Sequence, residues 1–486
     1  MNLPDLSIRR PVAVVMVFLL VVVLGVVSLG RLKLDLMPKM TIPVAAVITT
    51  YEGAGPYEVE NMITRPLEES LATVANITGI NSQSASGRSL VVLEFDWGVN
   101  MDFALLDVRE RIDLIKGFLP DEAGDPIVIK FDPSMMPVMN LAVSGDTGQA
   151  KLKQIAEDEI GPRLERVPGV ASVGVAGGLV RQITVDIDQE KLNAYGLSLQ
   201  NVVQTLQAEN LNLPGGFAQT GTLELVVRTL GEFTDLRDIA GINLATPAGG
   251  AVKLSEIAAI TDTFREQTGY VLLNGEPAVS LNLQKEAGAN TGDVSRRVRK
   301  ELEAIRAGLE DGVTLSVVQD QAEFIQEAIG ELRNNAIVGG LLAVFILLLF
   351  LKNLASTLII ALAIPISIIG TFALIYFGKL TINMMTLGGL ALGVGMMVDN
   401  AIVVLENTYR LRQEGASLAD AARDGASEVG MAISASTLTT MVAFLPVVFT
   451  RGMAAQIFRE LSLTVSFSLL ASLFVALTLV PMFCSK

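Results

Sequence analysis

Apolar and polar positions divide the chain into membrane-like stretches and one long polar block. Apolar stretches occur once near the N-terminus and five times after residue 330, and a polar block of about 300 residues separates them. A helix needs about 20 apolar residues to cross a hydrocarbon core of about 30 Å, so the pattern predicts six transmembrane helices. They cover residues 12–29, 336–351, 355–377, 383–407, 429–449 and 461–483.

The first apolar stretch also predicts the orientation of the chain. It exceeds the apolar region of a signal peptide, about 7–15 residues, and is interpreted as an uncleaved anchor. Arg9 and Arg10 precede it, and the positive-inside bias holds such a flank in the cytoplasm. We therefore expect the polar block on the extracytoplasmic side. A helical pattern that continues from Gln321 into residues 336–351 is expected to join the block directly to the membrane.

The polar block alternates between strand-like and helix-like periods. Residues 31–133 predict the order βαββαβ, which is that of a ferredoxin-like unit. A second unit of the same order is predicted from residues 134–180 and 265–330, and residues 181–264 interrupt it as a small inserted domain. Within the insertion, Leu213-Pro214-Gly215-Gly216 is expected to form a turn, since glycine pairs favour turns. The first unit's strands are expected at 43–51, 80–86, 90–97 and 127–131, with helices at 56–74 and 102–118.

Composition and charge exclude several classes of function. The chain is 51% hydrophobic and 18% charged, with a mean hydropathy of +0.50, which is too apolar for a soluble protein of 486 residues. A net charge of −15 and the lack of a basic stripe argue against nucleic acid as a partner. The chain has no histidine and a single cysteine, Cys484, so a Cys-based metal site and imidazole chemistry are excluded, and we expect no metal site and no cofactor, because no motif indicates a nucleotide site.

One acid lies inside an apolar stretch, Asp399 within residues 383–407. An ionised acid in hydrocarbon is costly, so such an acid normally faces the interior of a helix bundle and marks a proton or ion path. Gly389, Gly393 and Gly395 leave the same helix with little side chain, so another helix could approach closely. The simpler interpretation is that Asp399 bonds a neighbouring helix and the glycines only pack.

Several motifs resemble the resistance-nodulation-division (RND) superfamily of multidrug exporters, in the same order along the whole chain. They are Arg9-Arg10-Pro11-Val12, Tyr51-Glu52-Gly53-Ala54-Gly55-Pro56, Arg65-Pro66-Leu67-Glu68, Ala194-Tyr195-Gly196-Leu197-Ser198, Leu213-Pro214-Gly215-Gly216 and Gly395-Met396-Met397-Val398-Asp399-Asn400-Ala401.

The resemblance implies a proton-driven exporter of hydrophobic or amphiphilic compounds in a bacterial inner membrane, working as a homotrimer with a periplasmic adaptor and an outer-membrane channel. The α+β head would then comprise two ferredoxin-like porter subdomains, residues 31–133 and residues 134–180 with 265–330, and a docking subdomain, residues 181–264. Residues 1–30 and 331–486 would form the helical membrane domain.

The resemblance also implies roles for individual residues. Asp399 matches the proton-carrying acid of the fourth helix, and Asn400 stands where the best-known members carry a second acid. Family chains are two such halves in tandem, so we expect a second transporter half or a C-terminal continuation that supplies a mid-membrane lysine. A substrate cleft is implied at Met135, Met136, Val138, Val173 and Val175; ordinary strand core is the alternative for these five. Gly215 and Gly216 would belong to a loop that reaches a neighbouring protomer.

Two other function classes stay open from the sequence. Distant relatives with similar membrane domains act in lipid or sterol handling or in protein translocation. A receptor or scaffold that transports nothing is the third class, but it leaves the cost of Asp399 unexplained. An enzyme is disfavoured, because without histidine no Ser/His or Cys/His arrangement exists.

Overall fold

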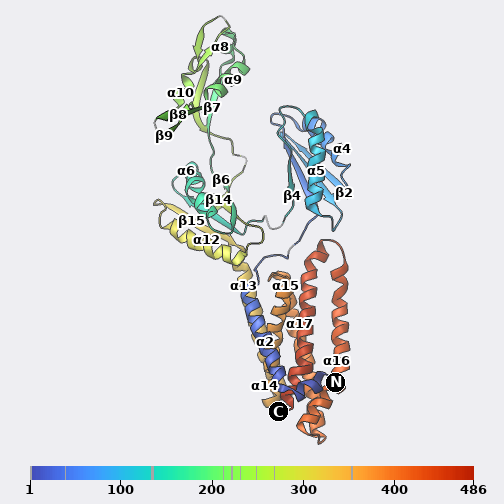
Figure 1. Ribbon diagram of the computed structural model, residues 1–486. Helices are drawn as coiled ribbons and strands as arrows, with labels where there is room; N and C mark the ends of the chain where they lie inside the picture. The colour runs from blue at the N-terminus through green and yellow to red at the C-terminus, as the bar shows by residue number, and fades with distance from the viewer. Residues whose placement is uncertain are drawn as a thin grey trace.

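Helices and α/β units occupy separate parts of the molecule, as the computed structural model shows (Figure 1). The structure describes residues 3–38, 40–132, 136–211, 213–220, 223–229, 231–247, 249–267, 269–351 and 354–486. A bundle of long helices forms one end and the α/β head forms the other, and both chain termini lie at the end of the bundle that is farther from the head (Figure 1).

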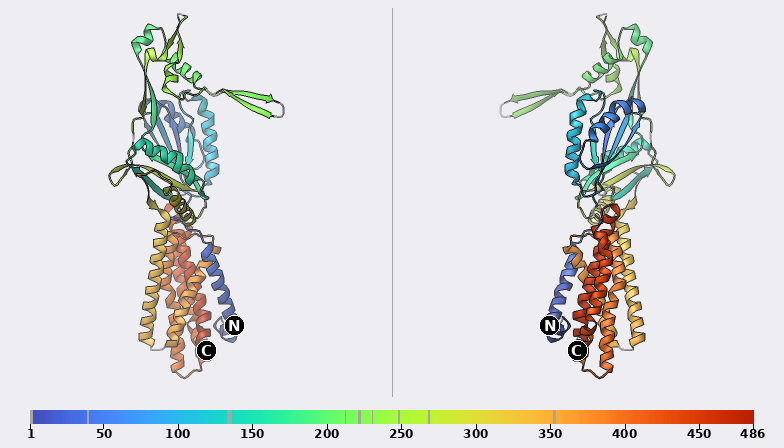
Figure 2. Two further views of the ribbon diagram at one scale, coloured as in Figure 1. Left: turned by 90° about the vertical axis from the view of Figure 1, so that its left-hand side faces the viewer. Right: turned by 90° about the vertical axis from the view of Figure 1, so that its right-hand side faces the viewer.

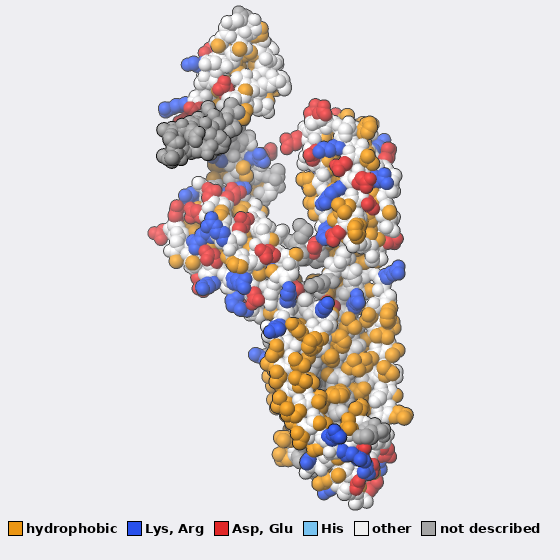
Figure 3. Space-filling view, viewed as in Figure 1, with side chains coloured by type: hydrophobic (Ala, Val, Ile, Leu, Met, Phe, Trp, Pro, Cys, Tyr) orange, Lys and Arg blue, Asp and Glu red, His pale blue; other side chains and the backbone are white. Residues whose placement is uncertain are grey.

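Six helices in the described part of the chain are long and apolar enough to cross a membrane. The sequence predicts this number, and the predicted continuous helix from Gln321 is confirmed. On the face seen in Figure 3, hydrophobic side chains cover the bundle, and charged groups gather at its lower end and over the head. The six are α2 (Pro11–Arg31), α13 (Gln321–Leu351), α14 (Leu354–Phe377), α15 (Met384–Gln413), α16 (Leu418–Phe449) and α17 (Met453–Cys484); a short helix, α1 (Leu3–Arg9), precedes them.

The first α/β unit is a four-stranded antiparallel sheet with helices packed on one face. Its strand order is β2-β3-β1-β4. In β1, alternate residues such as Ala45 and Val47 are fully buried, because strand side chains alternate between the two faces of a sheet. Its elements are β1 (Val44–Thr50), α3 (Pro56–Val59), a π-helical turn (Glu60–Thr64), α4 (Arg65–Leu71), β2 (Ile77–Ala85), β3 (Arg88–Phe95), α5 (Met101–Ile115) and β4 (Ile127–Lys130).

The second α/β unit repeats this arrangement. Its strands are ordered β6-β14-β5-β15, which is the same permutation, with the short β13 (Leu272–Leu273) also beside β14. Nineteen buried residues from its strands and helices form one hydrophobic core. Its elements are β5 (Met139–Gly145), α6 (Gln149–Gln154), a π-helical turn (Ile155–Ile160), α7 (Gly161–Glu165), β6 (Val170–Gly177), β14 (Glu276–Lys285), α12 (Thr291–Arg306) and β15 (Val313–Asp320).

An insertion separates β6 from β14. A two-stranded ribbon of β7 (Arg181–Ile187) and β12 (Ala258–Phe264) leads to its small core. A hairpin of β8 (Leu213–Thr220) and β9 (Leu223–Thr229) extends away from the rest of the head (Figure 2). The insertion also contains α8 (Gln189–Ala194), α9 (Leu199–Glu209), α10 (Leu236–Ala240), β10 (Asn243–Ala245), β11 (Ala251–Lys253) and α11 (Leu254–Ile257).

The predicted turn at residues 213–216 is wrong, because these residues lie within β8. The strand pairing shifts register between Pro214 and Phe217, where the two glycines stand. Glycine suits a shift of register, because the extra residue of a β-bulge often needs a backbone conformation that glycine adopts easily. The connection between β8 and β9 falls on residues 221 and 222, outside the described residues.

The second unit is joined to the bundle by the junction of β15 and α13. Asp320, whose side chain is 1% exposed, ends the strand, and its carboxylate accepts the Ala322 N–H at 2.9 Å. Ser295 and Arg299 of α12 donate to the same carboxylate at 2.6 and 2.8 Å. The hydrogen bond to Asp320 raises the pKa of Arg299. The start of α13 is therefore fixed to α12.

Candidate functional site

Asp399 lies near the middle of α15. The helix begins after Asn383, whose side chain accepts the N–H groups of Met385 at 2.9 Å and Thr386 at 3.1 Å. Asn383 is fully buried, so this cap is sheltered from solvent. A buried capping asparagine satisfies two of the N–H groups that every helix start leaves without intrahelical partners. The first turn of α15 is therefore well capped.

Small residues bring α15 very close to α17. A Cβ atom added to Gly389 would lie 2.8 Å from the Leu461 carbonyl oxygen, and one added to Gly393 would lie 2.6 Å from the Ser468 side chain. One turn further, the Ser472 hydroxyl donates to the Met397 carbonyl at 2.6 Å. Close backbone approach through small residues is a common mode of helix packing in membranes. The expectation for Gly389 and Gly393 is met; α15 is held on α17 along this side.

Asp399 lies on the opposite side of α15 and is exposed on the surface of this chain. Gly395 lies one turn before Asp399, and a Cβ added to it would have no atom within 4 Å. The sequence predicts close packing at Gly395, but the described helices do not pack closely there. Gly395 lines a cavity of about 280 Å³ together with Asn335 of α13 and Ile364 of α14. No described residue forms a hydrogen bond or an ion pair with the carboxylate of Asp399.

Asp399 therefore lies on a face of α15 that the described helices leave uncovered. A carboxylate in the middle of a spanning helix is stable only when it is protonated, paired or in contact with water. None of the described neighbours supplies a cation. A helix face becomes interior only when another element covers it, so the expected interior position of Asp399 stays a prediction about a second transporter half.

Asn400 points toward α16. The Thr437 hydroxyl donates to its Oδ1 at 3.2 Å, while its Nδ2 is buried and has no hydrogen-bond partner among the described residues. Buried amide groups almost always find a partner. Adjacent positions on α15 thus carry an acceptor, Asp399, and a donor, Asn400 Nδ2, that the described helices leave unsatisfied. Asn400 Nδ2 is enclosed by this chain, whereas Asp399 is exposed and can meet a polar group from outside these helices.

The residues implied as a substrate cleft lie in different environments. Met136 is 55% exposed and lines a cavity of about 300 Å³ at the base of the head. Val138 is 2% exposed and belongs to the core of the second unit. Val173 and Val175 of β6 pack against the same core, on the side that the helices cover. Met135 lies outside the described residues. Of the four that the structure describes, Met136 is the most exposed, Val173 and Val175 are partly buried, and Val138 is buried.

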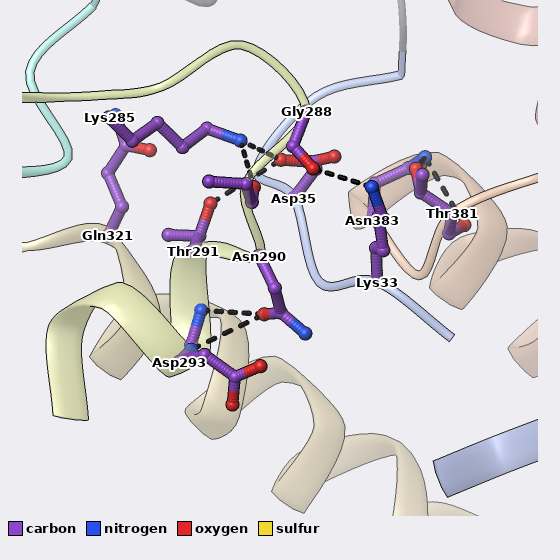
Figure 4. A network of polar contacts seen from close by, with 12 residues as sticks. Lys33, Asp35, Lys285, Gly288, Asn290, Thr291, Asp293, Gln321, Thr381 and Asn383 are labelled. Carbon is purple, nitrogen blue, oxygen red and sulfur yellow. Dashed lines mark hydrogen bonds and ion pairs between the residues drawn. The ribbon is translucent and has the colours of Figure 1, made fainter. Parts of the chain in front are cut away.

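A polar network at the junction of head and bundle is absent from the sequence interpretation. Asp35 follows α2, Lys285 ends β14, and the two form an ion pair with side chains that are 15% and 9% exposed (Figure 4). They are 250 residues apart in the chain. Each stands near the end of a largely apolar element, but other charges, Lys33 and Glu286, lie within two residues, so the sequence offers no clear signal for the pair.

Comparison with known proteins covers nearly the whole chain. The model of the AcrB/AcrD/AcrF family matches residues 3–486. Multidrug resistance protein MdtC of Escherichia coli is 30% identical over 481 residues, which are 99% of this chain and 47% of that protein. The protein of the same name from Shigella boydii gives the same values, and that from Yersinia enterocolitica is 30% identical over 482 residues with the same coverage. The chain spans about half the length of the curated relatives it matches.

Proposed function

Because the chain belongs to the AcrB/AcrD/AcrF family of RND multidrug efflux transporters, we propose that it is the N-terminal half of a pump that exports hydrophobic or amphiphilic compounds in exchange for protons. The whole-chain family match and the six spanning helices support transport across a membrane. The observation that carries the proton coupling is Asp399, an acid in the middle of a spanning helix to which no described residue is paired.

The two α/β units act in this proposal as ferredoxin-like porter subdomains. Their shared element order and strand permutation support the assignment, since four antiparallel strands with helices on one face match the split βαβ arrangement. Residues 181–264 act as a docking subdomain, and the projecting β8–β9 hairpin suits contact with a neighbouring protomer of a homotrimer (Figure 2). The head lies outside the bacterial inner membrane, where a periplasmic adaptor and an outer-membrane channel complete the path.

Asp399 serves as the proton carrier, and Asn400 orients groups beside it. The carboxylate binds a proton when it is desolvated and releases it when a cation approaches. That cation comes from a second transporter half, as a mid-membrane lysine. Two observations support the second half: the chain covers 47% of its relatives' length, and Asp399, which is exposed on the surface of this chain, lacks a partner among the described residues. Two identical halves would instead place two acids of like charge together and would bring no cation to either of them.

Asp399→Asn in the complete transporter tests the proposal. The change is isosteric and removes only the titrating charge, so we expect the protein to fold and assemble but to lose both export and substrate-stimulated proton flux in proteoliposomes. One proton crossing the membrane supplies about 2.3 kcal/mol per 100 mV, and losing that step removes the driving force. Glu406→Gln is the matched control, because Glu406 is an exposed acid on the same helix. Export at the parental rate by Asp399→Asn would end the proton-carrier proposal.

Expression of this 486-residue chain alone tests the second half. We expect the chain to insert into vesicles but to give no substrate-coupled proton flux, whereas co-expression with a half that contains a mid-membrane lysine restores it. Coupled transport by the purified chain alone would contradict the need for a different second half.

A further inference from the structure

The segment 32–38, called the strap below, runs from α2 toward the head and lies between the bundle and the second α/β unit (Figure 4). On the bundle side, Leu34 and Ile382 form a parallel β-bridge, with backbone hydrogen bonds of 2.9 and 3.0 Å around it. Ile382 directly precedes Asn383, the cap of α15. The strap is therefore fixed to the beginning of the helix that carries Asp399.

On the head side, the strap is held by charge. The carboxylate of Asp35 forms an ion pair with the Lys285 ammonium and accepts a hydrogen bond from the Thr291 hydroxyl at 3.4 Å. Lys285 also donates to the Ala289 carbonyl at 2.9 Å, and the Thr291 N–H donates to the Leu34 carbonyl at 3.1 Å. Thr291 is the first residue of α12. One short segment thus contacts the beginnings of both α15 and α12.

Lys285 continues this connection into the sheet of the second unit. It is the last residue of β14, which lies between β5 and β6. β14 is hydrogen-bonded to both of these strands, and Lys285 itself pairs with Val170 of β6. The ion pair is mostly buried, and separating two charges in a low dielectric costs much more than separating them in water. Apolar side chains can slide over one another at little cost. The Asp35–Lys285 ion pair instead favours one distance between the strap and β14, so displacing one of them favours displacement of the other.

We propose that Asp35 and Lys285 are positioning residues for transport, and that their ion pair transmits displacement of α15 to β14 of the second unit. The inference rests on the proposed function, because the displacement is attributed to protonation of Asp399 on α15. It adds a specific contact to that function: the strap, not only the continuous helix α13, connects the bundle to the head.

A distance measurement tests the connection independently of transport. Spin labels are placed by Lys300→Cys on α12 and Phe377→Cys at the end of α14, both exposed, in a chain whose single native cysteine is removed by Cys484→Ser. We expect one narrow distance distribution in the parent. Asp35→Asn and Lys285→Met should each broaden it, and the exchange Asp35→Lys with Lys285→Asp should narrow it again. Lys151→Met is the matched control, because its pair with Glu310 in the same unit is exposed.

Proton flux in the complete transporter tests the role. For Asp35→Asn we expect substrate export to fall by about tenfold, within the usual range of coupling free energies, while proton uptake without substrate persists because Asp399 is unchanged. Thermal unfolding of each variant shows whether it is folded, and the exchange variant should recover export.

Three results would overturn the inference. The distance distribution could stay narrow in both single variants, or the exchange variant could behave no better than they do. Proton uptake and export could also fall together, as expected for Asp399→Asn, which would indicate a purely structural role. If Asp399→Asn itself exports normally, the proposed function fails, and the distance measurement still decides whether Asp35 and Lys285 position the second unit.

Discussion

The two α/β units share one fold but differ in what their open faces offer. Each has the same strand permutation, and in each the first helix contains a π-helical turn that ends two residues before a proline, Pro66 in one and Pro162 in the other. Proline lacks an N–H and clashes with the preceding turn, so the hydrogen-bond pattern widens there. The shared irregularity strengthens the view that the second unit repeats the first.

The sheet faces without helices differ in chemistry. In the first unit the register places Ile48 beside Ile127 and Ala46 beside Ile129, so the part of this face over β1 and β4 is apolar, and Ile127 is 59% exposed. At the other edge, β2 adds polar side chains to it, those of Asn81 and Gln83. In the second unit the corresponding face is polar. It carries Ser172, Ser280, Asn282, Gln284 and Asn140. An apolar face of this kind needs a cover, whereas a polar face can remain hydrated.

The comparison shows that backbone topology and surface role are set by different residues. The buried positions of each strand define the common fold, and the alternate positions define what the sheet contacts. The second unit additionally carries the insertion and holds the bundle through Asp320 and Lys285. It is the unit best placed to respond to the membrane helices.

The largest expected effect on stability comes from truncating a core residue in either α/β unit. Leu93 in β3 and Leu281 in β14 occupy the third strand of each unit and are fully buried. Truncating either to alanine should destabilise its unit by about 2–5 kcal/mol, because a cavity replaces packed methyl groups. Thermal unfolding and protease susceptibility of the detergent-solubilised chain measure this.

Leu106→Ala is the control, since Leu106 on α5 is 56% exposed. It should change stability by less than about 0.5 kcal/mol. A large cost at Leu93 with none at Leu281 would show that the units are not equivalent in packing, despite their common topology.

Much of the fold can be predicted from the sequence, because alternating apolar and polar residues indicate a half-buried strand and a long apolar stretch indicates a spanning helix. The first strand is predicted at 43–51 and observed as Val44–Thr50, and α13 continues from the head into the bundle as expected. The turn at 213–216 is mispredicted, because a glycine pair also suits an irregular strand. A glycine in the sequence shows that the backbone can adopt unusual conformations, but it does not show whether a turn or an irregular strand forms there.

The candidate site is less accessible to sequence reasoning. Asp399 is found because an acid in an apolar stretch is rare, but its outward orientation depends on which helices cover α15. Asp35 and Lys285 could not be paired from sequence, since 250 residues separate them and only the folded chain brings them together. Val173 and Val175 are strand residues whose face depends on register, which periodicity alone does not fix.

A moderate effect is expected from exchanging the chemistry of the open faces. Ile127→Thr combined with Ile129→Thr keeps the β-branched shape and removes apolar surface, so self-association of the detergent-solubilised chain should weaken with little change in stability. Ser280→Val combined with Asn282→Val should strengthen association. Sedimentation velocity over a range of concentrations measures both. If the two double variants behave alike, the chemical contrast between the faces has no consequence in solution.

The smallest effect is expected in the two-stranded ribbon of β7 and β12. This ribbon connects the insertion to the second unit, and the first unit has no counterpart of it among the described residues. Arg181 of β7 donates to Asp262 of β12 at 2.7, 3.0 and 3.1 Å, and these hydrogen bonds hold the pKa of the Asp262 carboxyl below its usual range. A carboxyl whose pKa is lowered in the folded state stabilises that state above its unfolded pKa, about 3.9, and loses this contribution as the pH falls through the folded pKa. The side chains are 67% and 40% exposed, so the contribution is small and weakens with salt.

Asp262→Asn should therefore slightly increase protease cleavage of the ribbon at neutral pH, and the difference from the parent should disappear in acid. Asp186→Asn, a change on the same ribbon at an acid for which no ion pair is seen among the described residues, is the control. A difference for Asp262→Asn that persists undiminished in acid would show that the carboxyl charge is not what holds the ribbon.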